Sequence, residues 1–433
     1  MADKATLPLL TAVPKTEGGS PWLTKLRRTA VENAERTGLP GVRTEAWKFT
    51  NLNALKALEP VAATGTAEIA RLPAFADLQA VELHLSNGTL THADAMPEGV
   101  DLVGLAEPDD APDWVSETLG TVAETAPHPF TAINTGAFTG GIALRIRKGA
   151  AVETPILLLV DTRSLEGAGT VAAHPRILVV VEDGAMADLV EVHTGGGAYV
   201  NNAVTELVIG KDARLGHYKL QAESGEAFHI AMTAARCAAN STYDNFALST
   251  GATLSRNEIR ATLAGRHIEY RINGGYLACG DQHMDTATFI DHAEPDCASH
   301  ELYKGVLADR AHGVFQGKIL VRPDAQKTDG YQMNRALLLS REAEINSKPE
   351  LEIYADDVKC SHGATVGELE DDQLFYLMAR GIPEERARAI LVSAYVDEAV
   401  DHIQREPIRD AFRAAAAEWM QKNIAGAPAE GGL

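Results

Sequence analysis

The sequence predicts a mainly β protein, with a strand-rich centre flanked by an N-terminal helical and irregular region and a C-terminal helical domain. From about residue 141 to residue 366, short runs of β-branched and aliphatic residues alternate with Gly, Asp and Asn. Apolar residues at helical spacing occur only before and after this block. A chain of 433 residues is long enough for more than one folding unit. We therefore divide it into residues 1–140, 141–366 and 367–433.

The N-terminal region begins with one predicted helix. Ser20 is a suitable N-cap, Pro21 suits the first helical position, and Gly38 is a natural C-terminal stop. Between them, Leu26 and Ala30 lie one helical turn apart, as on a buried face. The residues that follow are rich in proline and contain only short apolar stretches. We expect an irregular α+β segment there, up to residue 140.

The central block shows strand patterns and little helical periodicity. In the segment 266–273, Ile268, Tyr270 and Ile272 alternate with other residues and would share one face of a strand. Many short strands, of five to eight residues, fit a sandwich, a large barrel or a solenoid. A β-solenoid is favoured, because small turn residues recur between the strands, at Gly149-Ala150, Gly184-Ala185, Lys211-Asp212-Ala213 and Gly251-Ala252.

The C-terminal domain is predicted to consist of helices. The first ends at Gly381, and the second opens at Pro383 and carries an apolar stripe over residues 387–395. A third opens at Pro407 and runs toward Met420. The stripe fits packing within the protein, docking of a partner, or both on different faces.

Charge and hydropathy exclude several classes of function. Lys and Arg total 39 against 60 Asp and Glu, a formal net charge of -21, which repels nucleic acid and anionic lipid surfaces. No apolar stretch of 18 residues is present, and the first fifteen residues lack the apolar core of a signal peptide. We expect a cytoplasmic protein that binds neither nucleic acid nor membranes.

The four cysteines are dispersed along the chain. None forms a Cys-x-x-Cys pair, so the sequence contains neither a zinc ribbon nor a self-contained four-cysteine cluster site. Reduced thiols are the expectation for a cytoplasmic protein. Cys237, Cys279 and Cys297 are interpreted as structural, with no role assigned.

Several long strings are specific enough to identify a family. The longest is Pro349–Thr365, and a shorter one near the N-terminus is Arg43–Thr50. The others lie between or just after them, at Leu302–Gly305, Gly313–Lys318, Ala325–Gly330, Leu374–Leu377 and Arg380–Ile382. In these strings the chain resembles the SufB/SufD family of iron-sulfur cluster assembly proteins. The run Lys359–Gly363 has the form associated with the SufD branch.

This resemblance implies a fold, a function and a set of partners. The fold would be a right-handed parallel β-helix core between the two flanking regions. The function would be that of a scaffold subunit of the SUF complex, not an enzyme by itself. A SufB-type paralogue would pair with it, or a second copy in isolation, and the ABC-type ATPase SufC would dock on its C-terminal helices. The cofactor would be a transient iron-sulfur cluster shared with SufB, not held stably by the isolated chain.

Cys360 and His362 are the candidate metal-binding residues. They lie two residues apart, so on a strand their side chains point to the same face, as sharing a metal ion requires. Two ligands are too few for a cluster, and a partner subunit would supply the rest. Alternatively, Cys360 packs as a small apolar residue and His362 bonds a backbone carbonyl. Asp356 and Asp357, which precede them, are interpreted as turn residues.

A second hypothesis comes from a different class of protein. A β-solenoid enzyme acting on polysaccharide with paired carboxylates would fit a chain rich in Asp and Glu. Phe, Trp and Tyr make up only 6% of the chain, whereas sugar-binding surfaces favour aromatic stacking. Co-purification with an ATPase or a brown colour would favour the scaffold, and cleavage of a glycan would favour the enzyme.

Overall fold

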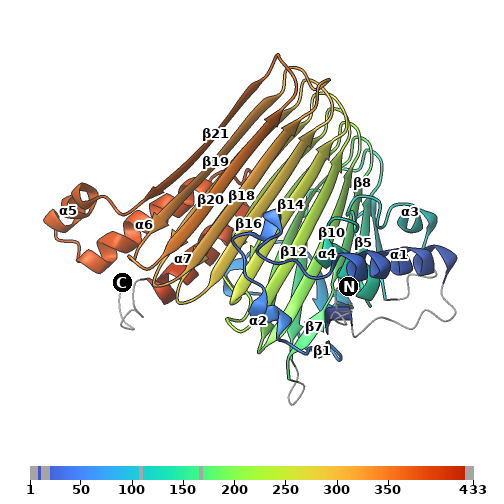
Figure 1. The fold of residues 1–433 in the computed structure, drawn as a ribbon, viewed down its shortest axis with the longest axis horizontal. Helices are drawn as coiled ribbons and strands as arrows, with labels where there is room; N and C mark the ends of the chain where they lie inside the picture. Colours follow the sequence, from blue (N-terminus) through green and yellow to red (C-terminus); the bar gives the residue numbers. More distant parts are fainter. Residues whose placement is uncertain (1–7, 11–19, 107–110, 165–168, 425–433) are drawn as a thin grey trace.

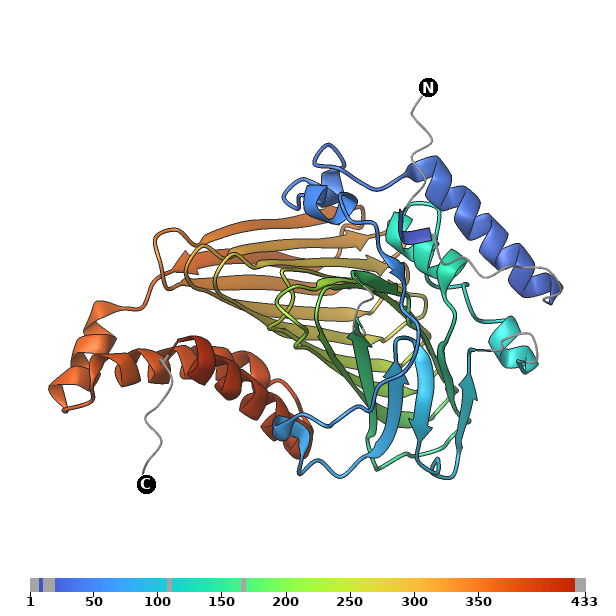
Figure 2. The same ribbon diagram turned by 90° about the horizontal axis from the view of Figure 1, so that it is seen from below.

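The protein is a parallel β-solenoid with helices along its sides (Figures 1 and 2). The computed structural model describes residues 8–10, 20–106, 111–164 and 169–424. Most of the first fifteen residues, on which the absence of a signal peptide was judged, lie outside the described residues. The predicted mainly β architecture with a solenoid core and C-terminal helices is confirmed.

Two sheets form the solenoid, and from β8 to β21 successive strands of the chain alternate between them. Sheet A consists, in spatial order, of β20 (Glu344–Ile353), β18 (His312–Val321), β16 (His283–His292), β14 (Leu254–Leu263), β12 (Phe228–Cys237), β10 (Tyr199–Ile209), β8 (Arg176–Val181), β5 (Gly141–Ile146) and β4 (Val100–Gly104), with β7 (Val171–Ala173) and β1 (Val61–Ala62) beside it. Sheet B consists of β21 (Lys359–Gly367), β19 (Asp329–Leu338), β17 (Ala298–Leu307), β15 (Glu269–Ala278), β13 (Thr242–Ser249), β11 (Arg214–Gln221), β9 (Met186–Gly196), β6 (Ile156–Arg163), β2 (Val81–Ser86) and β3 (Thr89–Ala93).

Most strands are longer than the five to eight residues expected. Each strand from β14 to β20 spans ten residues. Polar residues that point inward, such as Asn257 and Thr286, interrupt the apolar runs by which strand length was judged. The strands continue through these positions because parallel neighbours on the same sheet supply their backbone hydrogen bonds.

The corners of the solenoid explain the recurring turn residues. Gly149, Gly184, Asp212 and Asn240 all adopt positive φ, which Gly, Asp and Asn tolerate best. The turns are stacked, since the amide of Gly149 donates to Asp183, that of Gly184 to Lys211, and that of Asp212 to Ala239. The recurring turn residues at 149–150, 184–185 and 211–213 are therefore consecutive copies of one corner.

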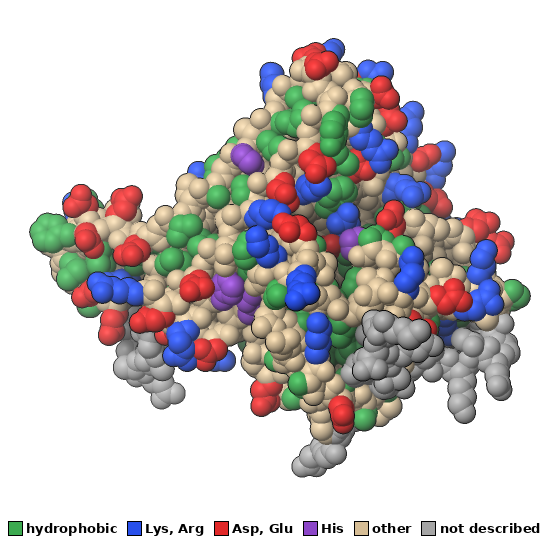
Figure 3. All heavy atoms as spheres, viewed as in Figure 1, with side chains coloured by type: hydrophobic (Ala, Val, Ile, Leu, Met, Phe, Trp, Pro, Cys, Tyr) green, Lys and Arg blue, Asp and Glu red, His purple; other side chains and the backbone are tan. Residues whose placement is uncertain are grey.

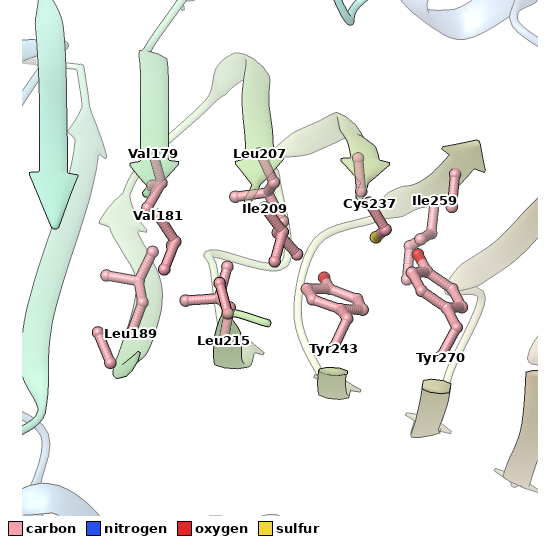
Figure 4. Packing of buried hydrophobic residues seen from close by; sticks show 14 of the residues in the cluster. Val179, Val181, Leu189, Leu207, Ile209, Leu215, Cys237, Tyr243, Ile259 and Tyr270 are labelled. Carbon is pink, nitrogen blue, oxygen red and sulfur yellow. The ribbon is translucent and has the colours of Figure 1, made fainter. Parts of the chain in front are cut away.

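The interior is divided into an apolar and a polar half. In Figure 4, valine, leucine and isoleucine side chains of sheet A point toward Leu189, Leu215, Tyr243 and Tyr270 of sheet B. The alternate positions farther along the same strands are often polar, and buried histidines and carboxylates bond one another there. One example is Glu191, which is bonded by the ring nitrogens of His193 and His217.

Helices cover the outer faces of both sheets. The helices are α1 (Pro21–Thr37), α2 (Asn53–Lys56), α3 (Asp113–Ser116), α4 (Pro129–Ala137), α5 (Asp371–Ala379), α6 (Glu384–Val400) and α7 (Glu406–Asn423), with short 3-10 turns at Pro8–Leu10, Glu45–Trp47 and Pro73–Phe75. As predicted, α1 follows Ser20 and ends before Gly38. α6 and α7 share one apolar cluster with the outer face of sheet B, and α4 with Trp47 packs on sheet A (Figure 2).

Within the described ranges, no helix has both the length and the apolar character needed to cross a membrane.

Candidate functional site at the open end of the solenoid

The two predicted metal-binding residues lie on the last strand of sheet B. On β21, Cys360 pairs with Gly330 of β19, and His362 pairs with Gln332. Cys360 packs against the apolar core inside the solenoid. Because residues two apart on a strand share a face, His362 also points to the inner side. The structure thus brings both side chains to the mouth of the last turn, a region we call the open end, formed by β20 and β21 (Figure 1).

Cys360 is half-buried beneath this mouth. A Cβ atom on Gly330 would lie 3.2 Å from Cys360 Sγ, so the glycine leaves the space that the thiol occupies. Burial raises the pKa of the Cys360 thiol. At neutral pH the thiol is therefore protonated, and it becomes a thiolate ligand only when a nearby cation favours the charged form.

His362 is exposed at the rim, above a polar row. In register behind it, Gln332 of β19 and Glu301 of β17 point to the same inner side and are fully buried. Gln332 Nε2 donates to Glu301 Oε2 over 2.8 Å. Burial raises the pKa of Glu301 to about 7. The imidazole thus lies between bulk solvent and a buried amide–carboxyl pair.

Both strands of the open end have one free edge. In the described residues, β20 and β21 are the last strands of their sheets. The amide of Lys359 donates to Thr328 on the β19 side, and strand geometry then directs the amides of Cys360, His362 and Ala364 to the free edge. On β20, the amides of Glu344 and Tyr354 donate toward β18, so the backbone amides of the odd-numbered residues point to the free edge.

Pro349 lies at one of these positions on β20, where the backbone nitrogen faces the free edge. Proline has no amide hydrogen, so it is tolerated where the edge of a sheet needs no donor. Most residues of β20 and β21 are exposed or half-buried, unlike those of the strands behind them. Long edges of this kind are templates for pairing with another strand.

Beyond this end, α5 carries an exposed apolar surface. The side chains of Phe375, Tyr376 and Met378 are 72%, 57% and 41% exposed, and Ile390 of α6 is 40% exposed. In Figure 3, hydrophobic side chains gather at the tip occupied by α5. A contiguous apolar surface on a helix that projects from the body is typical of a protein interface.

The remaining predicted residues lie away from the open-end mouth or point outward. Cys237 and Cys297 are buried, and Cys279 is half-buried beside Asn423 of α7. Burial raises the pKa of Cys237 to about 12. Asp356 and Asp357 are exposed in the turn between β20 and β21. The backbone amide of Asp357 donates to the side-chain oxygen of Gln326, which is a contact within the turn.

No three His, Cys, Asp or Glu side chains gather to hold a metal ion in the part of the chain that the structure describes. Cys360 and His362 supply two soft or borderline donors, fewer than an iron-sulfur cluster uses. As a metal site, the pair would need further ligands from another chain.

Sequence reasoning did not find Gln332 and Glu301. Both belong to strands that precede β21 by one and two turns, and neither forms a motif with Cys360 or His362. The available signal was alternation, because Ser299, Glu301, Gln332 and Asn334 are polar at inward positions. Linking these residues to His362 requires the register between turns, which no local pattern contains.

The chain is similar in sequence to a known protein family and to several of its members. Residues 163–395 match the model of a family described as SUF system FeS cluster assembly, SufBD core domain. The chain is 32% identical over 416 residues to an iron-sulfur cluster assembly SufBD family protein of Synechocystis sp., with 90% of each chain covered. It is 32% identical to the protein ABCI7, chloroplastic, of Arabidopsis thaliana, covering 90% of this chain and 85% of that one. It is 30% identical to the iron-sulfur cluster assembly protein SufD of Escherichia coli, covering 86% and 88%.

Proposed function

Because the chain belongs to the SufB/SufD family of iron-sulfur cluster assembly proteins, we propose that it is the SufD-type scaffold subunit of a SUF complex. The observation that carries the proposal is the open end, where two long strands leave free edges beside Cys360 and His362. The polysaccharide-enzyme hypothesis has no support from the family assignment.

The open end pairs with a SufB-type paralogue. A paralogue with the same solenoid would place one of its edge strands against each free edge, and backbone hydrogen bonds would then join the sheets of the two chains. A second copy of this chain takes that place when the paralogue is absent. Pairing covers the mouth between β20 and β21, whose residues are exposed or half-buried.

Cluster assembly takes place at this junction. Cys360 supplies a thiolate and His362 an imidazole nitrogen, and the paralogue supplies the remaining ligands for the iron that is the cargo of the complex. A site divided between two chains allows the cluster to leave when the chains move apart. The isolated chain holds no stable cluster.

The C-terminal helices receive the ATPase SufC. The apolar surface of α5 supports this assignment, because it projects from the body and no described residue covers it. α6 follows α5 directly and packs on sheet B. Movement of the ATPase would therefore reach the solenoid through α6, and the energy source lies outside this chain.

The test is the variant His362→Ala in a complex co-expressed with the SufB-type paralogue and SufC. We expect the complex to stay intact while its iron and acid-labile sulfide, and its transfer of clusters to an apo-acceptor, fall several-fold. The exposed imidazole contributes less than about 1 kcal/mol to stability, in the usual range for surface positions. Size-exclusion chromatography and thermal melting measure assembly and folding in the same samples.

Cys360→Ser is expected to give a similar or milder loss, because a hydroxyl is a poor ligand for soft metals but preserves the shape of the residue. The matched control is His92→Ala, which removes an exposed histidine from β3, the last strand at the opposite end of sheet B. Full cluster content in His362→Ala, or dissociation of the complex, would show that the pair is structural.

A further inference from the structure

The side-chain amide of Gln332 is buried, and only its nitrogen has a hydrogen-bond partner among the described residues. Its Nε2 donates to Glu301 Oε2 over 2.8 Å, which directs the NH₂ group toward β17. Its Oε1 is buried and has no hydrogen-bond partner among the described residues. A buried carbonyl oxygen without a partner is destabilising, so a donor beside it would be strongly favoured.

The register shows which side chain can supply that donor. On the inner face of sheet B, Glu301, Gln332 and His362 occupy equivalent positions on β17, β19 and β21. Neighbouring strands lie about 4.8 Å apart, within reach of long side chains. Since the NH₂ group of Gln332 is turned toward Glu301, its carbonyl oxygen belongs on the side of His362.

Gly317 holds the amide in this place. A Cβ atom on Gly317 of β18 would lie 2.0 Å from Gln332 Nε2 and 2.9 Å from Oε1. The amide therefore lies against the glycine backbone of the opposite sheet. This contact, together with the bond to Glu301, leaves the amide one orientation and little freedom to turn.

We propose that Gln332 is a positioning residue for His362. Gln332 Oε1 accepts a hydrogen bond from one imidazole N–H of His362. This bond fixes one tautomer of the ring and leaves the other ring nitrogen facing the open end. This inference rests on the proposed function, because it concerns how the same site presents its ligand. Metal-binding histidines commonly donate their second ring N–H to a carbonyl or carboxylate, which orients the ring. Here Gln332 is the acceptor and Glu301 fixes the acceptor.

Among the described residues, Glu301 is the charged side chain on the inner face around His362. Gln332 lies behind it, Cys360 lies beside it, and the inner row of β20 opposite consists of Ser347, Pro349 and Leu351. The carboxyl in its own row is that of Glu301, and either protonation state of this group offers an acceptor oxygen to Gln332 Nε2. The orientation of the amide thus does not depend on the charge of Glu301.

The experiment measures the tautomer of His362 directly in the full-length chain. Imidazole nitrogen shifts are recorded by NMR at pH 8 with ¹⁵N-labelled histidine, and the signal of His362 is assigned by its loss in His362→Gln. We expect one dominant tautomer in the wild type. In Gln332→Met, which keeps the length but removes the acceptor, we expect the mixture of tautomers seen for a free histidine side chain.

A mixture in the wild-type protein would overturn the proposal without any variant, and so would an unchanged tautomer in a folded Gln332→Met. The result is independent of cluster assembly. If the tautomer is fixed as expected but His362→Ala assembles clusters normally, the proposed function fails and the positioning contact stands. If His362→Ala loses clusters but the wild-type tautomer is mixed, only the positioning role fails.

Discussion

Three buried histidines and one half-buried histidine are held neutral inside this protein. Burial lowers the pKa of each of them to about 4, and they are His174, His229, His283 and His292. His174 shows why the neutral ring fits: its Nε2 lies 3.1 Å from the carbonyl of Leu9 and its Nδ1 lies 3.2 Å from the amide of Asn202. One nitrogen donates and the other accepts, which only a neutral imidazole can do.

These histidines make stability depend on pH. Their pKa is lower in the folded chain than the ordinary value near 6.5, so the unfolded chain binds more protons. The free energy of unfolding should therefore fall as the pH drops from about 6.5 toward 4, by on the order of 3 kcal/mol for each histidine. Glu301 acts in the opposite direction, because its raised pKa favours the folded state at low pH, and this contribution is lost as the pH rises through about 7.

Substitution of His174 by Gln should reduce this dependence. Glutamine keeps a donor and an acceptor but does not titrate, so unfolding between pH 6.5 and 4 should take up about one proton fewer. Denaturant unfolding at several pH values measures the slope, which is independent of any constant loss of stability from the substitution. An unchanged slope would mean that His174 is charged, or accessible, in the folded chain.

At the scale of elements, the C-terminal helices form an apolar core with the outer face of the solenoid. α6 and α7 bury the outer face of sheet B, including Phe246, Leu277 and Val306. The buried side chain of Lys304 anchors α6 further, since its Nζ donates to the carbonyl of Tyr395 and pairs with Glu398. Deleting everything after residue 367 would expose this apolar face, so truncation cannot separate docking from folding.

α5 is the element where docking can be tested without this damage. Phe375→Ser removes an aromatic ring that is 72% exposed, so the melting temperature should change little. If this ring is a central contact of SufC, its loss should weaken binding by about 2 kcal/mol or more, roughly thirtyfold. Titration calorimetry with the purified ATPase measures the change.

The matched control is Gln373→Ser on the same helix, which changes an exposed polar residue to another and should leave the affinity unchanged. Equal affinity of Phe375→Ser and the wild type would move the ATPase contact away from α5.

At the scale of the whole molecule, the two ends of the solenoid differ. At one end, each sheet finishes with an antiparallel strand, β4 against β5 and β3 against β2. At the other end, β20 and β21 continue the parallel sheets with no covering element among the described residues. The parallel end matches a partner of the same architecture, because strand addition there continues both ladders.

Ala364→Pro tests this pairing. The amide of Ala364 faces the free edge, so proline leaves the ladder between β19 and β21 intact but removes one donor and places its ring where a new strand would lie. Pairing with the SufB-type paralogue should weaken at least about tenfold, because one backbone hydrogen bond contributes about 1 kcal/mol and the ring adds a clash.

Analytical ultracentrifugation of the mixed chains measures pairing, and Ala364→Ser serves as the control. Thermal melting of the isolated chain should be close to that of the wild type. Wild-type pairing by a folded Ala364→Pro would show that the edge of β21 does not take part.

Local structure and family membership follow from short stretches of the sequence. The residues Ser20, Pro21 and Gly38 located α1, and alternation located the buried face of β15, since each of these signals lies within a few neighbouring residues. The run 359–363 gave Cys360 and His362 as candidates in the same way, and their role stays a prediction. Which residues meet across turns depends on the folded chain as a whole. Gln332 lies 31 residues from Glu301, and Lys304 lies 94 residues from Glu398. Such pairs depend on how the winding of the chain sets the register between strands, and no local pattern encodes that register.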